Sequence, residues 1–201
     1  MKTKICQAIE YTIEKHGDAI RKGSKIPYFT HPIAVMNILL EEQAFDSTIT
    51  DDVIVAGLLH DLNEDAGISI ETIKELYGDT VAKIVLDVSE PEELKQSSDK
   101  RGTWKQRKEH SIEVMKTADR FSKLVFCADK LANSKSINNN LLLGEDIFAQ
   151  FNTGKDEIFW YYNSVLEVLG EDQSLKNTRM YKLLNLTVQK ISKLSSEVSE
   201  K

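Results

Sequence analysis

Two pairs of ionisable residues follow a strongly apolar stretch of the chain. In AGLLHDLNEDAG (residues 56–67), His60 and Asp61 end the apolar run, and Glu64 and Asp65 come one helical turn later. On a continuous helix, residues four apart lie on one face, so each member of the first pair would lie under a member of the second. Acidic side chains concentrated beside an apolar core are costly unless a cation lies among them. The pattern therefore predicts a divalent metal site, whose nitrogen and oxygen donors suit manganese, iron or zinc better than calcium.

The remaining ligands must come from other segments, and the histidines differ in context. His31 stands at the entrance of a predicted helix, next to the loop RKGSKIPYF, and Pro32 restricts its backbone. His16 and His110 lie in polar contexts that are typical of exposed residues. We therefore expect His31 to join His60 at the metal.

Asp129 is a candidate ligand from a third helix. It stands in KLVFCADKLANSKS, where the apolar residues predict a buried helix with a single carboxylate pointing out of it. Asp is seldom buried without a partner, and a cation would provide one. An ion pair with Lys130 or Arg120 is the alternative explanation for this carboxylate.

The elements that must position these side chains are helices. Apolar residues recur mostly three and four positions apart, and proline occurs only at positions 27, 32 and 91, which predicts an all-α protein. We expect helices over residues 5–20 with an end near Gly23, then over 32–40, 50–65, 69–77, 81–88, 104–118, 121–136 and 155–169, with a weaker one over 140–151. The helix over 50–65 is apolar on nearly all sides, so it should be the central buried helix.

Local signals define several helix ends. Thr50 is the predicted N-cap of the central helix. Pro32 suits a first helical position, with His31 just outside the helix as its cap. Ser69 begins another helix without the full capping box, because Thr72 stands where Glu or Gln would be.

Three polar or amphipathic segments bear on binding. Residues 89–103 are polar and contain Ser, Gly and Pro, so we expect a mobile loop at or near a binding surface. Residues 98–110 carry five basic side chains, for which a solvated helix start is the simplest explanation. Residues 174–198 are predicted to form an amphipathic helix that packs on the domain or meets a partner.

The composition is that of one folded domain. The chain has 201 residues, of which 41% are hydrophobic and 29% charged, and its formal net charge of -6 argues against a general nucleic-acid binder. No segment resembles a membrane span or a secretory leader, so we expect a cytoplasmic protein without a membrane partner. Cys6 and Cys127 are expected to be buried free thiols without a catalytic role. Homo-oligomer formation is left open.

The order His31, His60-Asp61, Asp129 on separate helices resembles the HD superfamily of metal-dependent phosphohydrolases. The segments RKGSKIPYFTHP, AGLLHDLNEDAG, YGDTVAKIVLDVSE, TWKQRKEH, ADKLANSKS and FNTGKDEIFWYY are together similar to the hydrolase domain of RelA/SpoT homologues, and to free-standing small alarmone hydrolases. The likeness runs from about residue 14 to residue 170. It implies an HD-domain helical bundle over 1–170 with a C-terminal helical extension over 171–201, and we expect no synthetase domain.

The resemblance also implies a reaction and a set of roles. Family members remove the 3′-pyrophosphate of guanosine tetra- or pentaphosphate, giving GDP or GTP and pyrophosphate, usually with Mn²⁺. The metal ligands carry over to His31, His60, Asp61 and Asp129. The pair that orients and deprotonates the attacking water carries over to Glu64 and Asp65.

The substrate is polyanionic, and an acidic protein needs localised cations to hold it. Arg21 and Lys22 match the family's basic pair, and Arg suits bidentate contact with phosphate. The resemblance places Asn133 against the nucleoside, with Ser136 as a neighbouring contact. Weaker candidates for phosphate or base contacts are Lys155, Tyr161, Lys105 and Arg107.

Some departures from the family pattern leave the substrate open. Leu62 and Asn63 separate the two ionisable pairs, Ala66 follows where the family often has Thr, and the loop over 89–103 differs in length and sequence. One alternative is an HD phosphohydrolase that acts on another nucleotide, including adenosine alarmones. The other is a non-catalytic, nucleotide-sensing helical module, for which the amphipathic C-terminal segment is the motivation.

Overall fold

Helices form the regular secondary structure of this chain. The computed structural model describes residues 2–22, 24–95, 99, 101–145, 147–151 and 153–198. Over these residues the only β-type pairing is an isolated antiparallel bridge between Ile20 and Pro27, so the predicted all-α class is confirmed. The elements, in chain order, are α1 (Lys4–His16), α2 (Thr30–Gln43), α3 (Asp51–Leu59), α4 (Leu62–Asp65), α5 (Ile70–Tyr77), α6 (Asp79–Val88), α7 (Glu92–Lys95), α8 (Trp104–Thr117), α9 (Arg120–Leu142), the 3-10 helix η1 (Ile147–Gln150), α10 (Lys155–Gly170), α11 (Gln173–Lys176) and α12 (Arg179–Val198).

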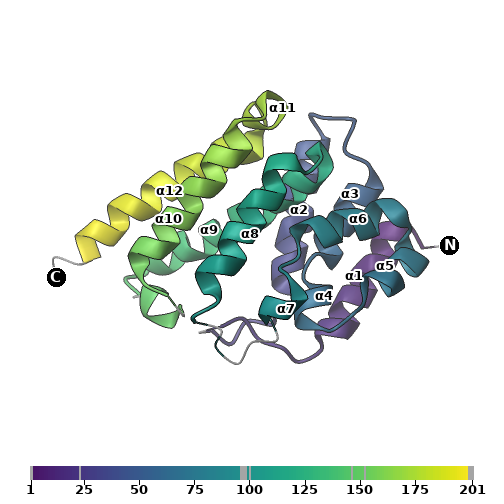
Figure 1. Cartoon of the computed structure of the whole chain (residues 1–201), viewed down its shortest axis with the longest axis horizontal. Coiled ribbons are helices and arrows are strands. Elements are labelled where there is room, and N and C mark those ends of the chain that lie inside the picture. The colour runs from purple at the N-terminus through teal and green to yellow at the C-terminus, as the bar shows by residue number, and fades with distance from the viewer. Residues whose placement is uncertain are drawn as a thin grey trace.

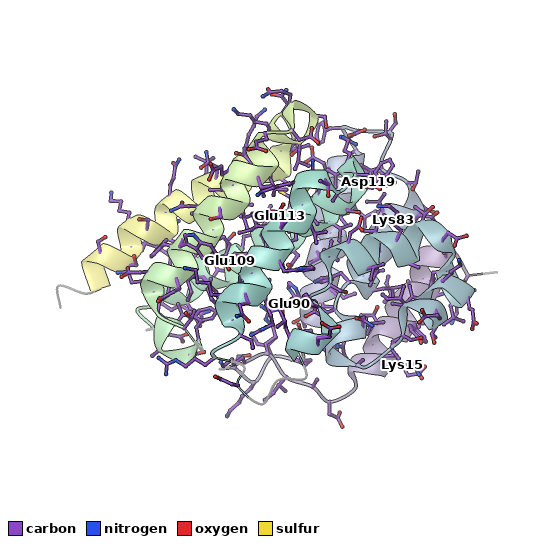
Figure 2. All side chains as sticks on the ribbon, viewed as in Figure 1. Lys15, Lys83, Glu90, Glu109, Glu113 and Asp119 are labelled. Atoms are coloured by element: carbon purple, nitrogen blue, oxygen red, sulfur yellow. The ribbon has the colours of Figure 1, made fainter. Side chains whose placement is uncertain are left out.

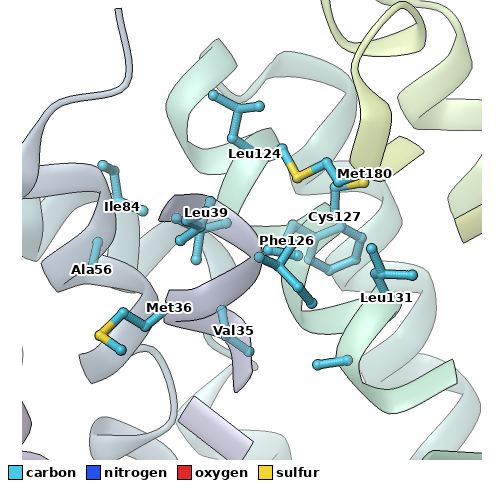
Figure 3. Packing of buried hydrophobic residues seen from close by; sticks show 14 of the residues in the cluster. Val35, Met36, Leu39, Ala56, Ile84, Leu124, Phe126, Cys127, Leu131 and Met180 are labelled. Carbon is cyan, nitrogen blue, oxygen red and sulfur yellow. The ribbon is translucent and has the colours of Figure 1, made fainter. Parts of the chain in front are cut away.

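Two helices lie at the centre of the packing. Helix α3 contacts α1, α2 and α6, and every residue from Val53 to Leu59 is buried, as its apolar sequence predicted. Helix α9 contacts α2, α3 and α12 (Figure 1). Figure 3 shows side chains of α2, such as Leu39, between those of α3 and α9. The apolar core therefore joins α2, α3 and α9, the helices that carry or adjoin the predicted metal ligands.

Several predicted boundaries were wrong for local reasons. Helix α1 ends at His16, because Gly17 adopts a φ of 50° there and its N–H bonds to the Ile13 carbonyl. The predicted end near Gly23 lies outside the described residues, and Ile20 belongs to the loop instead of the helix.

Two other ends differ from the prediction in detail. Helix α2 begins at Thr30, so His31 lies in its first turn and is not its cap. Thr50 precedes α3 but forms no side-chain capping bond, whereas the Ser69 hydroxyl does accept from the Thr72 N–H. The weaker helix predicted over 140–151 is in fact the end of α9 followed by η1.

The segment over 89–103 contains the short helix α7, and part of this predicted loop (96–98 and 100) lies outside the described residues. Of the two free cysteines, Cys127 is buried as expected, and its burial raises the pKa of the thiol, but Cys6 is exposed on the outer face of α1. In the described ranges, no helix combines the length and hydropathy that a bilayer crossing needs.

The amphipathic C-terminal helix packs on the rest of the chain. Helix α12 runs along α9 and also contacts α10 (Figure 1). Its inner residues join the same core as those of α2 and α3: Met180, Leu184, Val188 and Ile191. The division of the chain at residue 170 stays a prediction.

Gly57 allows α3 to approach α2 closely. A Cβ added there would lie 2.4 Å from Leu39 Cδ1 and 3.3 Å from Val35 Cγ1, and both side chains are fully buried. We expect Gly57→Ala to lower the free energy of unfolding by about 1–3 kcal/mol, because the tightly packed side chains must shift. Urea denaturation would measure this. Leu39→Val removes the overlapping Cδ atoms, so the same Gly57→Ala change should cost less in that background, and an equal cost would contradict the steric explanation.

Glu42 fixes the start of α12 from within α2. Its carboxylate is buried and accepts hydrogen bonds from the N–H groups of Arg179 (3.1 Å) and Met180 (2.9 Å). A carboxylate at a helix N-terminus also interacts favourably with the helix dipole. We expect Glu42→Ala to destabilise the protein by about 1–3 kcal/mol, because buried donors lose their acceptor. Glu42→Gln retains an acceptor oxygen and should lose less in thermal denaturation; equal losses would argue that the hydrogen bonds contribute little.

Candidate metal centre and substrate cavity

The predicted metal ligands converge from three parts of the fold. His31 comes from the first turn of α2, His60 from the turn that follows α3, and Asp129 from the middle of α9. One ligand atom of each lies within 4.8 Å of the others, and all three residues are buried. The geometry therefore provides a compact group of two nitrogen donors and one oxygen donor.

Asp61 flanks this group. Its Oδ1 lies 3.0 Å from His60 Nε2, and its Oδ2 lies 3.5 Å from His31 Nε2. On the other side, Asp129 Oδ1 lies 3.1 Å from His31 Nε2 and 3.8 Å from His60 Nε2. The two imidazoles thus lie between two carboxylates, as a cation site would require.

His60 is prepared to act as a ligand. Its Nδ1 lies 2.9 Å from the Gly57 carbonyl oxygen, which can only accept, so Nδ1 carries the proton. The lone pair is then on Nε2, which is buried and forms no hydrogen bond of good geometry with any described residue. Backbone carbonyls commonly orient metal-binding histidines in this way. This donor set fits a divalent cation, since Nε2 lies 3.0 Å from Asp61 Oδ1 without a well-aligned hydrogen bond.

The charges of the group are strongly coupled. Burial would lower the pKa of His60, but Asp61 and Asp129 outweigh it and raise that pKa well above its usual value. Burial would raise the pKa of Asp129, but the Lys130 ammonium and the two imidazoles hold it well below its usual range. The carboxylates therefore remain ionised and demand a positive charge, from protons or from a cation.

The helix that was predicted over 50–65 breaks where the ligands lie. Helix α3 ends at Leu59 and α4 begins at Leu62, so His60 and Asp61 occupy the turn between them. The expectation that His60 and Asp61 lie under Glu64 and Asp65 on one helix is therefore wrong. Asp61 has φ -93° and ψ -9°, a backbone conformation in which active-site residues often lie.

Tyr28 connects Asp61 with Asp65. The Tyr28 hydroxyl donates to Asp61 Oδ2 (2.9 Å), and Asp65 also interacts with this hydroxyl. Burial and the neighbouring Asp61 raise the pKa of Asp65. His16 was expected on the surface, but it is only 5% exposed and its ring stacks on Tyr28 with 4.8 Å between centroids. Burial of α1 against the 20–28 loop overrides the polar local sequence, and it lowers the pKa of His16.

A cavity of about 410 Å³ opens beside the metal ligands. Its wall holds the four cationic side chains Arg21, Lys22, Lys108 and Lys130. Aromatic rings and amides also line it, together with carboxylates and aliphatic side chains; the aromatic and amide residues are Tyr28, Trp104, Phe151, Tyr161, Tyr162, Asn133, Asn140 and Gln150. Ligand sites of this volume commonly combine an apolar lining with a few polar groups.

Most of the predicted substrate residues line this cavity. Arg21 Nη2 donates to Asn133 Oδ1 (3.0 Å), and Asn133 Nδ2 donates to Asp129 Oδ1 (2.5 Å), so these residues form a chain from the loop to the metal group. Lys22 and Ser136 also line the cavity. So does Tyr161, whose buried hydroxyl has no hydrogen-bond partner among the described residues.

The prediction that Lys155 contacts the substrate is corrected by the structure, because Lys155 does not line the cavity. It begins α10, and its ammonium donates to the Ser195 carbonyl oxygen of α12 (2.9 Å). Of the two weaker basic candidates, Lys105 lies over the Trp160 ring, and Arg107 pairs with Glu90.

Two cavity cations were not predicted. Lys130 was considered only as an ion-pair partner of Asp129, and it does pair with Asp129 Oδ2 (2.5 Å), but its side chain also reaches the cavity. Lys108 was one of several cations in a polar segment, and the spacing of that segment alone did not indicate which of them faces inward. Arg120, the other proposed partner of Asp129, instead pairs with Asp46.

The Tyr28 hydroxyl should support metal binding. Tyr28→Phe removes the donor to Asp61 while keeping the ring that stacks on His16. We expect a loss of about 10- to 100-fold in divalent-metal affinity, as is usual for partners of metal ligands. Calorimetric titration with Mn²⁺ and Zn²⁺ would measure it. Tyr11→Phe is the matched control, because Tyr11 packs on Tyr77, and unchanged affinity in Tyr28→Phe would contradict this role.

Comparisons with known proteins agree with this geometry. A family model described as HD domain matches residues 8–153. The guanosine-3′,5′-bis(diphosphate) 3′-pyrophosphohydrolase MESH1 of Danio rerio is 35% identical over 136 residues, which are 67% of this chain and 69% of that protein. MESH1 of Drosophila melanogaster is 32% identical over 70% of this chain and 73% of its own length.

Solved structures are similar as well. The crystal structure of lmo0812 from Listeria monocytogenes EGD-e is 30% identical, covers 81% of this chain and 99% of its own, and has a TM-score of 0.69. A metazoan ortholog of SpoT, described as hydrolysing ppGpp, shares the fold with a TM-score of 0.68 at 24% identity, over 95% of this chain and 94% of its own. The chain therefore belongs to the HD-domain family, in the branch of small alarmone hydrolases that includes MESH1.

Proposed function

We propose that this protein hydrolyses the 3′-pyrophosphate of guanosine tetra- or pentaphosphate, giving GDP or GTP and pyrophosphate, with Mn²⁺ as its metal. The observation that carries the proposal is the meeting of His31, His60, Asp61 and Asp129 at one end of a cavity whose wall holds four cationic side chains. MESH1 relatives named for this reaction support the choice of substrate.

The metal would be held by the two imidazoles and by Asp129, with Asp61 as the fourth protein ligand. Such a cation, when bound, supplies Lewis-acid activation of water and of a phosphoryl oxygen. The chain contributes the fixed orientation of the donors, through the Gly57 carbonyl on His60 and the Tyr28 hydroxyl on Asp61. Asn133 and Lys130 do the same for Asp129.

Glu64 and Asp65 are the proposed acid-base residues. Hydrolysis consumes one water: its oxygen bonds to phosphorus, the bond from phosphorus to the ribose 3′ oxygen breaks, and that oxygen takes up a proton. Glu64 lines the cavity and can accept the proton of the attacking water. The raised pKa of Asp65 suits a proposed role in holding or returning a proton.

The cationic wall is proposed to bind the phosphates. Arg21 is oriented by Asn133 at the metal end of the cavity, and Lys22 follows it in the chain. The Lys108 and Lys130 ammonium groups each stand about 5 to 6 Å from the centre of the Tyr161 ring, and Lys130 also pairs with Asp129. Asn133 and Ser136 are the proposed contacts to the nucleoside.

The test is the release of pyrophosphate from guanosine tetraphosphate by the purified protein with Mn²⁺. We expect turnover by the wild type and a loss of at least about 10³-fold in the His60→Ala/Asp61→Ala variant, because the proposed metal site loses two of its four protein ligands. Elemental analysis of the same preparation identifies the metal. Lys116→Met, which removes an exposed cation far from the cavity, is the control for surface charge.

A substrate panel separates this proposal from its alternatives. Preference for an adenosine alarmone, or for a nucleotide without a 3′-pyrophosphate, would reassign the substrate while retaining the metal site. Stoichiometric binding of guanosine tetraphosphate without turnover, in metal-replete protein, would identify a sensor. Equal turnover by the wild type and the double variant would reject the proposed site.

A further inference from the structure

Glu90 contacts the proposed catalytic carboxylate through its backbone. It lies directly after α6, where Ser89 ends the helix in extended conformation, and its N–H donates to Glu64 Oε1 at 2.6 Å. A backbone donor at this distance fixes the position of one carboxylate oxygen. Glu64 and Glu90 line the same cavity, so the bond lies at the wall of the proposed active site.

The side chain of Glu90 ties this backbone to α8. Glu90 Oε2 pairs with Arg107 Nη1 at 2.5 Å, and Oε1 pairs with Lys108 Nζ at 2.8 Å. The Glu90 side chain is only 9% exposed, so both ion pairs are largely shielded from water. Figure 2 shows Glu90 beside the first half of α8, apart from Glu113 further along that helix.

Both oxygens of Glu90 are therefore engaged at once by two cations of one helix. Burial alone would raise the pKa of Glu90, but Lys108 and Arg107 lower it to about 2, so the carboxylate stays ionised over the working pH range. A charged group held at two points has little rotational freedom, and its own backbone is restrained with it. Pro91, the next residue, restricts the backbone further.

These ion pairs change the interpretation of the basic residues in TWKQRKEH. Arg107 was considered as a phosphate ligand, but its guanidinium faces Glu90. Lys108 both pairs with Glu90 and lines the cavity. With Glu64 included, two cations and two carboxylates meet here, so their formal charges balance.

We propose that Glu90 is a positioning residue: the Arg107 and Lys108 ion pairs hold the Glu90 backbone so that its N–H keeps the Glu64 carboxylate aimed at the attacking water. The inference rests on the proposed function, in which Glu64 acts on that water. A misplacement of about 1 Å at a reacting group can lower a rate about 100-fold, so such a restraint has a measurable effect.

Two variants separate the parts of the restraint. Glu90→Gln keeps the N–H and the size of the side chain but loses the ionic anchor, and we expect kcat to fall about tenfold. Glu90→Pro also removes the N–H, and we expect a fall of about 100-fold. Ser89, at φ -78° and ψ 146°, already has the conformation that a following proline requires.

The measurement is a split between kcat and KM with guanosine tetraphosphate, together with Mn²⁺ affinity. Positioning of Glu64 predicts a lower kcat with Mn²⁺ affinity within about twofold of the wild type, in addition to any change in KM caused by releasing Lys108, whereas a general loss of structure would lower thermal stability and metal affinity together. Glu113→Gln, which breaks an exposed pair with Lys116 on the same helix, is the matched control and should leave kcat unchanged.

Amide hydrogen exchange at Glu90 tests its hydrogen bond to Glu64 by a measurement that does not depend on enzymatic activity. The Glu90 amide should be protected in the wild type, and it should exchange faster in Glu64→Ala and in Glu90→Gln. Rapid exchange in the wild type would overturn the inference, even if the protein proves inactive on every nucleotide and the proposed function fails. With an active wild type, unchanged kcat in Glu90→Gln and Glu90→Pro, or a raised KM at constant kcat, would overturn it while leaving the proposed function standing.

Discussion

Two imidazoles and two carboxylates meet where α2, α3 and α9 pack together. Burying these groups costs free energy, so the surrounding residues must supply hydrogen bonds and opposite charges that offset this cost. Each carboxylate accepts hydrogen bonds from neighbouring side chains. Asp129 accepts from Lys130 and Asn133, and Asp61 accepts from Tyr28. The Nε2 of His60 lies 3.0 Å from Asp61 Oδ1, but it forms no well-aligned hydrogen bond with any residue that the structure describes. Because buried polar groups are normally satisfied, this orphaned nitrogen between ionised carboxylates is the strongest local indication of a cation.

The electrostatics of the cavity differ from those of the whole molecule. The chain carries a formal net charge of -6, yet its cavity wall gathers Arg21, Lys22, Lys108 and Lys130. Local field, and not net charge, decides whether a polyanion enters a cleft. Two of these cations are also held by acidic partners, Lys130 by Asp129 and Lys108 by Glu90, which fixes their positions before any substrate binds. The acidic residues around the cavity thus orient its basic ones.

The sequence predicted the class of fold, and it predicted which side chains would gather beside the cavity, because both depend on residue type and periodicity. The apolar residues of α3 indicate burial, so the central buried helix was predicted correctly. They do not indicate where the helix ends, so its break at His60 was not predicted. His16 was misplaced because its burial depends on Tyr28, which is twelve residues away in the chain and folds back over α1. Lys155 was misplaced for a similar reason, since the packing of α12 on α10 draws its ammonium to Ser195. Lys108 could not be selected among neighbouring cations until the position of α8 against Glu90 was known.

The chain breaks between α3 and α4 within the segment 60–65, which carries both predicted metal ligands and the proposed base Glu64. On a continuous helix, adjacent side chains diverge by about 100°, so His60 and Asp61 would point in clearly different directions. In the turn, both reach the same metal group, with 3.0 Å between His60 Nε2 and Asp61 Oδ1. Helix α4 begins at Leu62, and its Glu64 accepts a hydrogen bond from the backbone N–H of Glu90, just after α6. Within the six residues from His60 to Asp65, the chain thus brings two predicted metal ligands and the proposed base Glu64 to one cavity.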